Sequence, residues 1–240
     1  MDTLHFASPK PRMIAHRGLS GIETENTCSA FVAAGNRSFF GIETDVHRTR
    51  DGRYIIIHDD DARRVSGESR IVEETDFDCL RSLRLFDHDG RRSRGDLMLP
   101  TLEEYIGICK TYKKAAVLEL KNHFQPADIE NIVAVIRGLG WLEQTIFISF
   151  DLPNMIVLRS LLPRQKAQLL IGDRVPADLL DTLKQYSLDL DIEYRLLTGE
   201  LAAACKSAGI EINVWTVNAP EDAERLAALG VDYITSNILE

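Results

Sequence analysis

The alternation of short apolar runs with amphipathic helical patterns constrains this chain more than any other feature. Such runs recur from one end of the 240-residue chain to the other, and helical patterns separate most of them. This alternation is typical of parallel strands with helices packed outside the sheet. The nine strand candidates are 12–16, 39–46, 53–58, 115–120, 145–150, 167–171, 188–193, 210–217 and 231–235.

The dipeptide Asp51-Gly52 accounts for one of these candidates. It is a strong two-residue hairpin signal, and the connection is too short for a parallel crossover. We therefore predict that 53–58 is an antiparallel arm folded back on the second strand. A two-residue loop places Asp45 directly opposite His58 across the arm, with Cβ atoms about 5 Å apart. The eight remaining strands predict an α/β fold of the TIM (β/α)₈ barrel type.

The segment 59–98 interrupts the alternation. It is polar and rich in arginine, with one short helical pattern near 76–84. Neither a linker nor a low-complexity tract sets it apart from the rest of the chain. We expect a small insertion over one end of the barrel, within a single domain that spans residues 1–240.

Charge and composition exclude several classes of partner. The chain has 37 acidic and 28 basic residues and a formal charge of −9, which argues against a surface for nucleic acid or anionic membranes. No apolar stretch approaches the about 18 residues of a membrane span. Four scattered cysteines without a CxxC pair favour free thiols in a reducing compartment. We expect a cytoplasmic protein that acts on a small molecule, without stable membrane association, and the oligomeric state stays open.

Three carboxylates stand near the ends of strand candidates. Glu43 and Asp45 are two residues apart, so their side chains share one face of a strand. Burying them unpaired costs several kcal/mol. Glu119 repeats the pattern on the next parallel strand. A single strand acid more often pairs with a cation, here Arg17 or Lys121, but three such acids favour Mg²⁺ or Ca²⁺.

Two histidines and three other side chains complete the candidate set. His16 and His58 end strands beside acidic groups, and imidazoles with near-neutral pKa values can supply the acid and the base that phosphodiester cleavage needs. A structural role is commoner for any single histidine. Arg17 and Lys121 suit either phosphate binding or charge balance. Trp215 suits either the core or an apolar wall beside an alcohol such as glycerol.

These residues resemble, in order and along nearly the whole chain, the motifs of the glycerophosphodiester phosphodiesterases. The matching segments are His16-Arg17-Gly18, Glu25-Asn26-Thr27, Glu43-Thr44-Asp45-Val46, Thr49-Arg50-Asp51-Gly52, His58-Asp59, Glu119-Leu120-Lys121 and Trp215-Thr216-Val217-Asn218. No single motif is decisive, but the ordered set is highly specific.

The resemblance implies a barrel of the phosphatidylinositol phospholipase C-like kind. It implies metal-dependent hydrolysis of glycerophosphodiesters to glycerol 3-phosphate and an alcohol. The implied site has His16 and His58 as the acid/base pair, Arg17 and Lys121 as phosphate ligands, and Glu43, Asp45 and Glu119 as ligands of one Mg²⁺ or Ca²⁺ ion. We place Trp215 with the substrate-binding residues.

The chain departs from the family pattern at two places. Thr24 stands where the family usually has proline, and 235–238 replaces the usual Thr-Asp-x-Pro. We expect both departures to alter the pocket rim without touching the metal or acid/base residues. We expect Gly18 to leave space for the substrate.

Two other functions stay open. Lysophospholipase D-like hydrolysis of a lipid diester requires an apolar entrance, which the insertion 59–98 would have to supply. A catalytically silent, ligand-binding barrel is the non-enzymatic alternative, and the presence of every candidate catalytic residue disfavours it.

Overall fold

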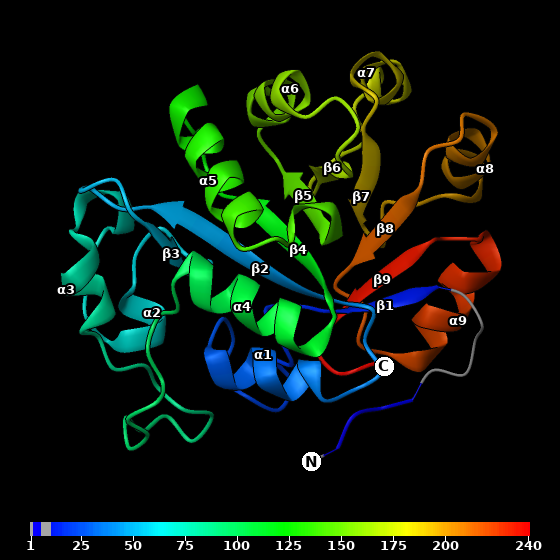
Figure 1. The fold of residues 1–240 in the computed structure, drawn as a ribbon. Coiled ribbons are helices and arrows are strands. Elements are labelled where there is room, and N and C mark those ends of the chain that lie inside the picture. The colour runs from blue at the N-terminus through cyan, green and yellow to red at the C-terminus, as the bar shows by residue number, and fades with distance from the viewer. Residues whose placement is uncertain (1, 6–10) are drawn as a thin grey trace.

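Eight parallel strands close into a barrel in the computed structural model, which describes residues 2–5 and 11–240 (Figure 1). The barrel strands are β1 (Arg12–Ala15), β2 (Gly41–Arg48), β4 (Ala115–Leu120), β5 (Thr145–Ser149), β6 (Ala167–Ile171), β7 (Asp189–Glu193), β8 (Ile212–Trp215) and β9 (Tyr233–Ser236). Strand β1 pairs with both β2 and β9, which closes the barrel. A further strand, β3 (Tyr54–Ile56), runs antiparallel to β2. The predicted TIM barrel is confirmed.

Helices between successive strands surround the barrel (Figure 1). They are α1 (Cys28–Gly35), α4 (Leu102–Tyr112), α5 (Pro126–Gly138), α6 (Leu152–Leu161), α7 (Leu179–Tyr186), α8 (Gly199–Ser207) and α9 (Pro220–Leu229), with a 3₁₀ turn η2 (Leu142–Gln144) before β5. Local sequence starts several of them: a capping box of Thr101 and Glu104 opens α4, and a proline stands in the first turn of α5 and α9.

Apolar side chains fill two layers, because successive strand residues point to opposite faces. The larger layer packs between strands and helices. The second fills the barrel interior and contains Ile14, Val117, Ile146, Ile148, Leu170 and Tyr233. This interior packing supports the strand ends where the polar candidates stand.

The arm formed by β2 and β3 has a different register from the one predicted. Val46 pairs with Ile56, and the backbone N–H of Ile57 donates to the carbonyl of Asp45 at 3.1 Å. Asp45 therefore lies opposite Ile57, and His58 follows one residue later. The expected pairing of Asp45 with His58 was wrong by one position.

The loop of this arm explains the shift. The N–H of Thr49 donates to the carbonyl of Arg53 at 2.8 Å, so three residues, 50–52, form the loop instead of two. Gly52 closes it with a φ of +81°, the left-handed conformation that a three-residue hairpin loop requires. One additional loop residue moves every cross-strand partner by one.

The segment 59–98 packs beside β3, outside the barrel (Figure 1). It contains α2 (Arg63–Ser66), the 3₁₀ turn η1 (Val72–Glu74) and α3 (Phe77–Arg81), and α3 corresponds to the helix expected near 76–84. A separate apolar cluster joins the segment to the arm through Ile55 and Ile57. The insertion therefore rests on the same arm that carries His58.

Two observations concern the environment of the chain. Within the described residues, none of the helices combines the length and apolarity that crossing a bilayer requires. Cys28, Cys79, Cys109 and Cys205 are free thiols, as their spacing predicted.

Candidate active site

The predicted residues meet in one pocket at the carboxyl ends of the barrel strands, where the side chains of parallel strands converge. Its lining residues are His16, Arg17, Glu43, Asp45, His58, Glu119, Ile148, Phe150, Leu170, Asp191, Trp215 and Thr235. Lys121 is the one predicted residue outside this lining, and its ammonium pairs with the carboxylates of Asp45 and Glu119.

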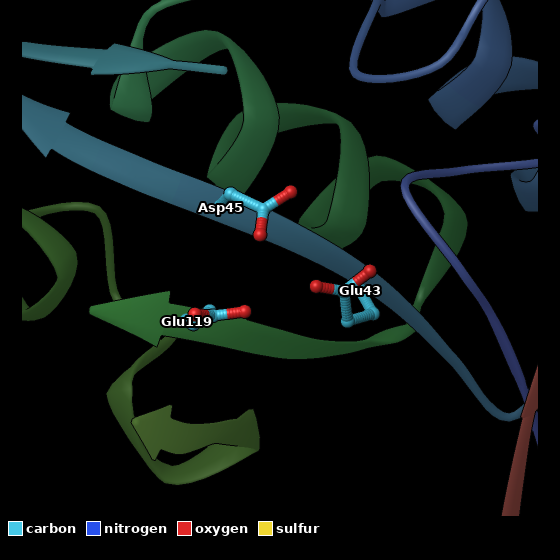
Figure 2. A group of neighbouring side chains, drawn as sticks. All are labelled: Glu43, Asp45 and Glu119. Carbon is cyan, nitrogen blue, oxygen red and sulfur yellow. The ribbon is translucent and has the colours of Figure 1, made fainter. Parts of the chain in front are cut away.

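The three carboxylates face a common space (Figure 2). Glu43 and Asp45 lie two apart on β2, and Glu119 is the in-register neighbour of Asp45 on β4. One oxygen from each lies within 4.8 Å of the others, and the three residues are 4%, 1% and 7% exposed. Strand periodicity and parallel pairing therefore create the cluster that the sequence predicted.

The electrostatics of this cluster favour a divalent cation. Burial and the neighbouring Asp45 raise the pKa of Glu43 well above its ordinary value, and the same causes raise the pKa of Glu119 to about 8. Burial also opposes ionisation of Asp45, but Arg17 and Lys121 hold its pKa below the ordinary value. Three convergent oxygen ligands that repel one another fit Mg²⁺ or Ca²⁺, whose charge would let all three ionise.

Arg17 and Lys121 balance part of this negative charge. The Nζ atom of Lys121 lies 2.9 Å from Glu119 Oε1 and 3.7 Å from Asp45 Oδ1. The backbone N–H of Arg17 donates to Glu43 Oε2 at 2.7 Å, and its Nε lies 3.8 Å from Asp45 Oδ2. The charge-balancing role is thus present, and Arg17 also lines the pocket.

A tight turn after β1 presents these groups. Arg17 and Gly18 have φ values of +54° and +75°, so the chain reverses immediately after His16. A Cβ atom at Gly18 would lie 2.7 Å from Ala30 Cβ. Helix α1, not substrate, occupies the space beside Gly18, and the expectation of a substrate-facing gap there was wrong.

Each histidine has its Nδ1 atom held by a neighbour. His16 Nδ1 lies 2.7 Å from Asn237 Oδ1, and His58 Nδ1 lies 2.7 Å from Asp59 Oδ1. Burial and the charge of Arg17 lower the pKa of His16 to about 4. Burial also lowers the pKa of His58. The expectation that 235–238 would not touch the acid/base residues was wrong, because Asn237 contacts His16 directly.

Sequence reasoning missed the role of Asn26. Its Nδ2 donates to Asp45 Oδ2 at 2.8 Å, and its Oδ1 accepts from Thr44 Oγ1 at 2.6 Å. Thr27, not Asn26, caps α1, since its side chain accepts from the backbone N–H of Ala30. The sequence signal for this role was the Glu-Asn-Thr motif, because a helix cap requires only one of its polar residues and leaves the asparagine without a purpose.

A charged network links the insertion to the pocket and was also missed. Arg64 Nε donates to Asp59 Oδ2 at 2.6 Å, and its Nη1 and Nη2 donate to the two oxygens of Glu25 at 2.9 and 2.8 Å. Glu25 also accepts from Arg17 Nη1 at 2.9 Å. Hydrogen bonding from Arg64 lowers the pKa of Asp59 to about 2. No sequence pattern distinguishes Arg64 from the other arginines of the insertion.

The rest of the pocket wall is mostly apolar. Trp215 meets Phe150 edge to face, with ring centroids 5.8 Å apart, and Phe150 is 49% exposed. Of the two roles considered for Trp215, the structure places it in the pocket wall.

Comparison with known proteins agrees with this geometry. Residues 16–239 match the model of the glycerophosphoryl diester phosphodiesterase family. A glycerophosphodiester phosphodiesterase of Caldanaerobacter subterraneus subsp. tengcongensis is 28% identical over 95% of this chain and 94% of its own length. One of Bacillus altitudinis is 27% identical over 93% of both chains.

A solved structure has the same fold. The Oleispira antarctica phosphodiesterase in complex with the product sn-glycerol-3-phosphate superposes with a TM-score of 0.85 at 24% identity, covering 98% of this chain and 96% of that one. The barrel and the ordered motifs agree with the family match over nearly the whole sequence, and the chain therefore belongs to the glycerophosphoryl diester phosphodiesterase family.

Proposed function

We propose that this protein hydrolyses glycerophosphodiesters to glycerol 3-phosphate and an alcohol, using a divalent cation and two histidines. The observation that carries the proposal is the buried triad of Glu43, Asp45 and Glu119, which shares a pocket with His16 and His58. The family match and the names of the relatives support the same reaction class.

Glu43, Asp45 and Glu119 would hold one Mg²⁺ or Ca²⁺ ion. When bound, such an ion neutralises phosphate oxygens and thereby supplies electrostatic catalysis. Arg17 binds the phosphate from the pocket side, and Lys121 keeps Asp45 ionised and partly opposes the raised pKa of Glu119. With a divalent cation bound, all three carboxylates could ionise beside these two cations, and the combined positive charge would suit a phosphodiester monoanion.

The environments of the two histidines support different roles for them. Asn237 Oδ1 can only accept, so His16 carries its proton on Nδ1 and presents the lone pair of Nε2. With a pKa of about 4, His16 is neutral at pH 7 and serves as the base. Burial lowers the pKa of His58, and the hydrogen bond to the Asp59 carboxylate opposes that shift. With His16 as the base, the role of donating a proton to the leaving alkoxide falls to His58. The base acts on either water or the substrate's own 2-hydroxyl.

One observation favours a second substrate class. Lysophospholipase D-like hydrolysis needs an apolar entrance, and the Phe150–Trp215 pair in the pocket lining supports one. This apolar pair lies at the ends of β5 and β8, and not in the insertion 59–98, which would otherwise have had to supply an entrance. Lysophospholipids therefore belong in the substrate panel.

The test is an assay of the full chain on glycerophosphodiesters and lysophospholipids with Mg²⁺, Mn²⁺ or Ca²⁺. We expect release of glycerol 3-phosphate that a chelator abolishes and added metal restores. Replacing His58 with Ala should lower kcat by about 10²- to 10⁴-fold, whereas the exposed His88→Ala serves as the matched control. Full activity of His58→Ala would refute the acid/base assignment, and tight binding without turnover would favour the silent barrel.

A further inference from the structure

The pocket has two chemically different halves. The strands β1, β2 and β4 and the arm contribute its charged groups, whereas the remaining strands contribute a mostly apolar wall. Two polar residues interrupt that wall, Asp191 on β7 and Thr235 on β9. The proposed reaction uses neither of them.

Asp191 is a buried carboxyl with an unused hydrogen-bonding atom. It is 1% exposed, and its Oδ1 has no hydrogen-bond partner among the residues that the structure describes. Its in-register neighbours are Leu170 and Asn213. Asn213 is already engaged, since its Oδ1 accepts from Thr235 at 3.2 Å and its Nδ2 donates to Gln168 at 3.5 Å.

No cation accounts for this carboxyl. The described part of the chain contains no ion pair to Asp191, and the carboxylate cluster suited to a metal contains only Glu43, Asp45 and Glu119. Burial raises the pKa of Asp191 to about 8 although Asn213 opposes the shift. At neutral pH the side chain is therefore mainly a carboxylic acid, which offers one donor and one acceptor.

A buried, unpaired polar atom in a pocket wall indicates a hydrogen bond that a ligand completes. An alcohol hydroxyl matches this carboxylic acid, because a hydroxyl both donates and accepts hydrogen bonds. An anion does not match, since Asp191 has no positive charge beside it. An alkyl group would leave Asp191 Oδ1 without a hydrogen-bond partner, and an unpaired buried polar atom costs free energy.

We propose that Asp191 determines specificity by hydrogen-bonding a hydroxyl of the substrate's glyceryl group. This inference rests on the proposed function, because the phosphate must occupy the charged half of the pocket for the glyceryl group to face Asp191. Apolar neighbours on the same wall, Leu170 and Trp215, contact the carbon skeleton. Asp191 thereby distinguishes a polyol phosphate from an alkyl phosphate of the same length.

The test compares the binding of glycerol 3-phosphate with that of n-propyl phosphate, which lacks both hydroxyls. Isothermal titration calorimetry is carried out on the full chain with Mg²⁺ and, separately, with Ca²⁺. We expect the unmodified protein to bind glycerol 3-phosphate about tenfold more tightly. Asp191→Leu should abolish this preference, and Asp191→Asn, which retains a donor and an acceptor, should keep it. Asp189→Asn, two residues earlier on β7 and outside the pocket lining, is the matched control.

A preference that survives in Asp191→Leu overturns the proposal, and so does an unmodified protein that binds both phosphates equally or not at all. Thermal unfolding checks that each variant folds, and Asp191→Ala replaces Asp191→Leu if the larger side chain prevents folding. Turnover is measured separately. If Asp191→Leu loses the preference for glycerol 3-phosphate but the unmodified protein shows no turnover, the Asp191 subsite is supported and the hydrolase is refuted. If the unmodified protein turns over substrate but Asp191→Leu keeps the preference, the hydrolase is supported and the subsite is refuted.

Discussion

At the scale of single residues, the site depends on how the two imidazoles are oriented. Asn237 Oδ1 accepts from His16 Nδ1 at 2.7 Å and from Ser20 Oγ at 2.9 Å. These contacts fix the ring and its tautomer without adding charge. Because an amide oxygen stabilises imidazolium less than a carboxylate does, His16 stays neutral over a wide pH range.

Replacing Asn237 with Asp should therefore move the pH dependence of kcat/KM. A negative charge beside His16 favours its protonated form and raises its pKa, so the loss of activity on acidification should begin about 1–2 pH units higher. The measurement is a pH–rate profile of the metal-loaded protein. Asn36→Asp adds the same charge at an exposed position on α1's end and should leave the profile unchanged. An unshifted profile in Asn237→Asp would contradict the role of His16 as the base.

At the scale of elements, the insertion positions the second histidine. Arg64 on α2 joins Asp59, the partner of His58, to Glu25 on the loop before α1. The arm and that loop are separate in the sequence, so Arg64 links two elements that surround the pocket. The insertion thus contributes to the geometry of the site although it lies outside the barrel.

Replacing Arg64 with Gln should lower kcat more than it changes KM. Without the guanidinium, the Asp59–His58 pair loses its fixed orientation, and we expect kcat to fall by about 10- to 100-fold. Stability should fall by no more than about 1 kcal/mol, because the arginine is half exposed and solvent screens its ion pairs. Steady-state kinetics and thermal unfolding measure the two effects. Arg70→Gln, which removes another exposed arginine of the insertion, should alter neither, and an unchanged kcat in Arg64→Gln would show that the network only supports the fold.

At the scale of the whole molecule, the carboxylate cluster couples metal binding to stability. The pKa of Glu119 in the folded, metal-free protein is raised from 4.5 to about 8. Its favourable contribution to folding is therefore complete below pH 4.5 and is lost as the pH rises through about 8. A cation that binds the ionised carboxylates counteracts this loss.

Saturating Mg²⁺ or Ca²⁺ should consequently raise Tm more at pH 8 than at pH 5. Each additional kcal/mol corresponds to about 2–4 °C for a chain of this size. Differential scanning calorimetry with metal and with chelator at both pH values gives the comparison. Glu119→Gln should reduce the pH dependence of the metal effect. A gain in Tm that is equal at both pH values would contradict metal ligation by these carboxylates.

The sequence by itself determined the features that local physics controls. Strand and helix alternation depends on side-chain periodicity over a few residues, so the barrel could be predicted before any contact was known. The common face of Glu43 and Asp45 follows from strand geometry alone. Parallel pairing then places Glu119 at the same end of the barrel, because all eight strands of a TIM barrel run in one direction.

Only the tertiary structure decided the contacts that link distant parts of the chain. The loop at 50–52 took three residues, which moved His58 one position from the expected partner of Asp45. The hydrogen bond between His16 and Asn237 spans 221 positions, and the unpaired oxygen of Asp191 follows from what its neighbours on two other strands already bind. Periodicity assigns a side chain to a face, but its partner there depends on the register and packing of the whole barrel.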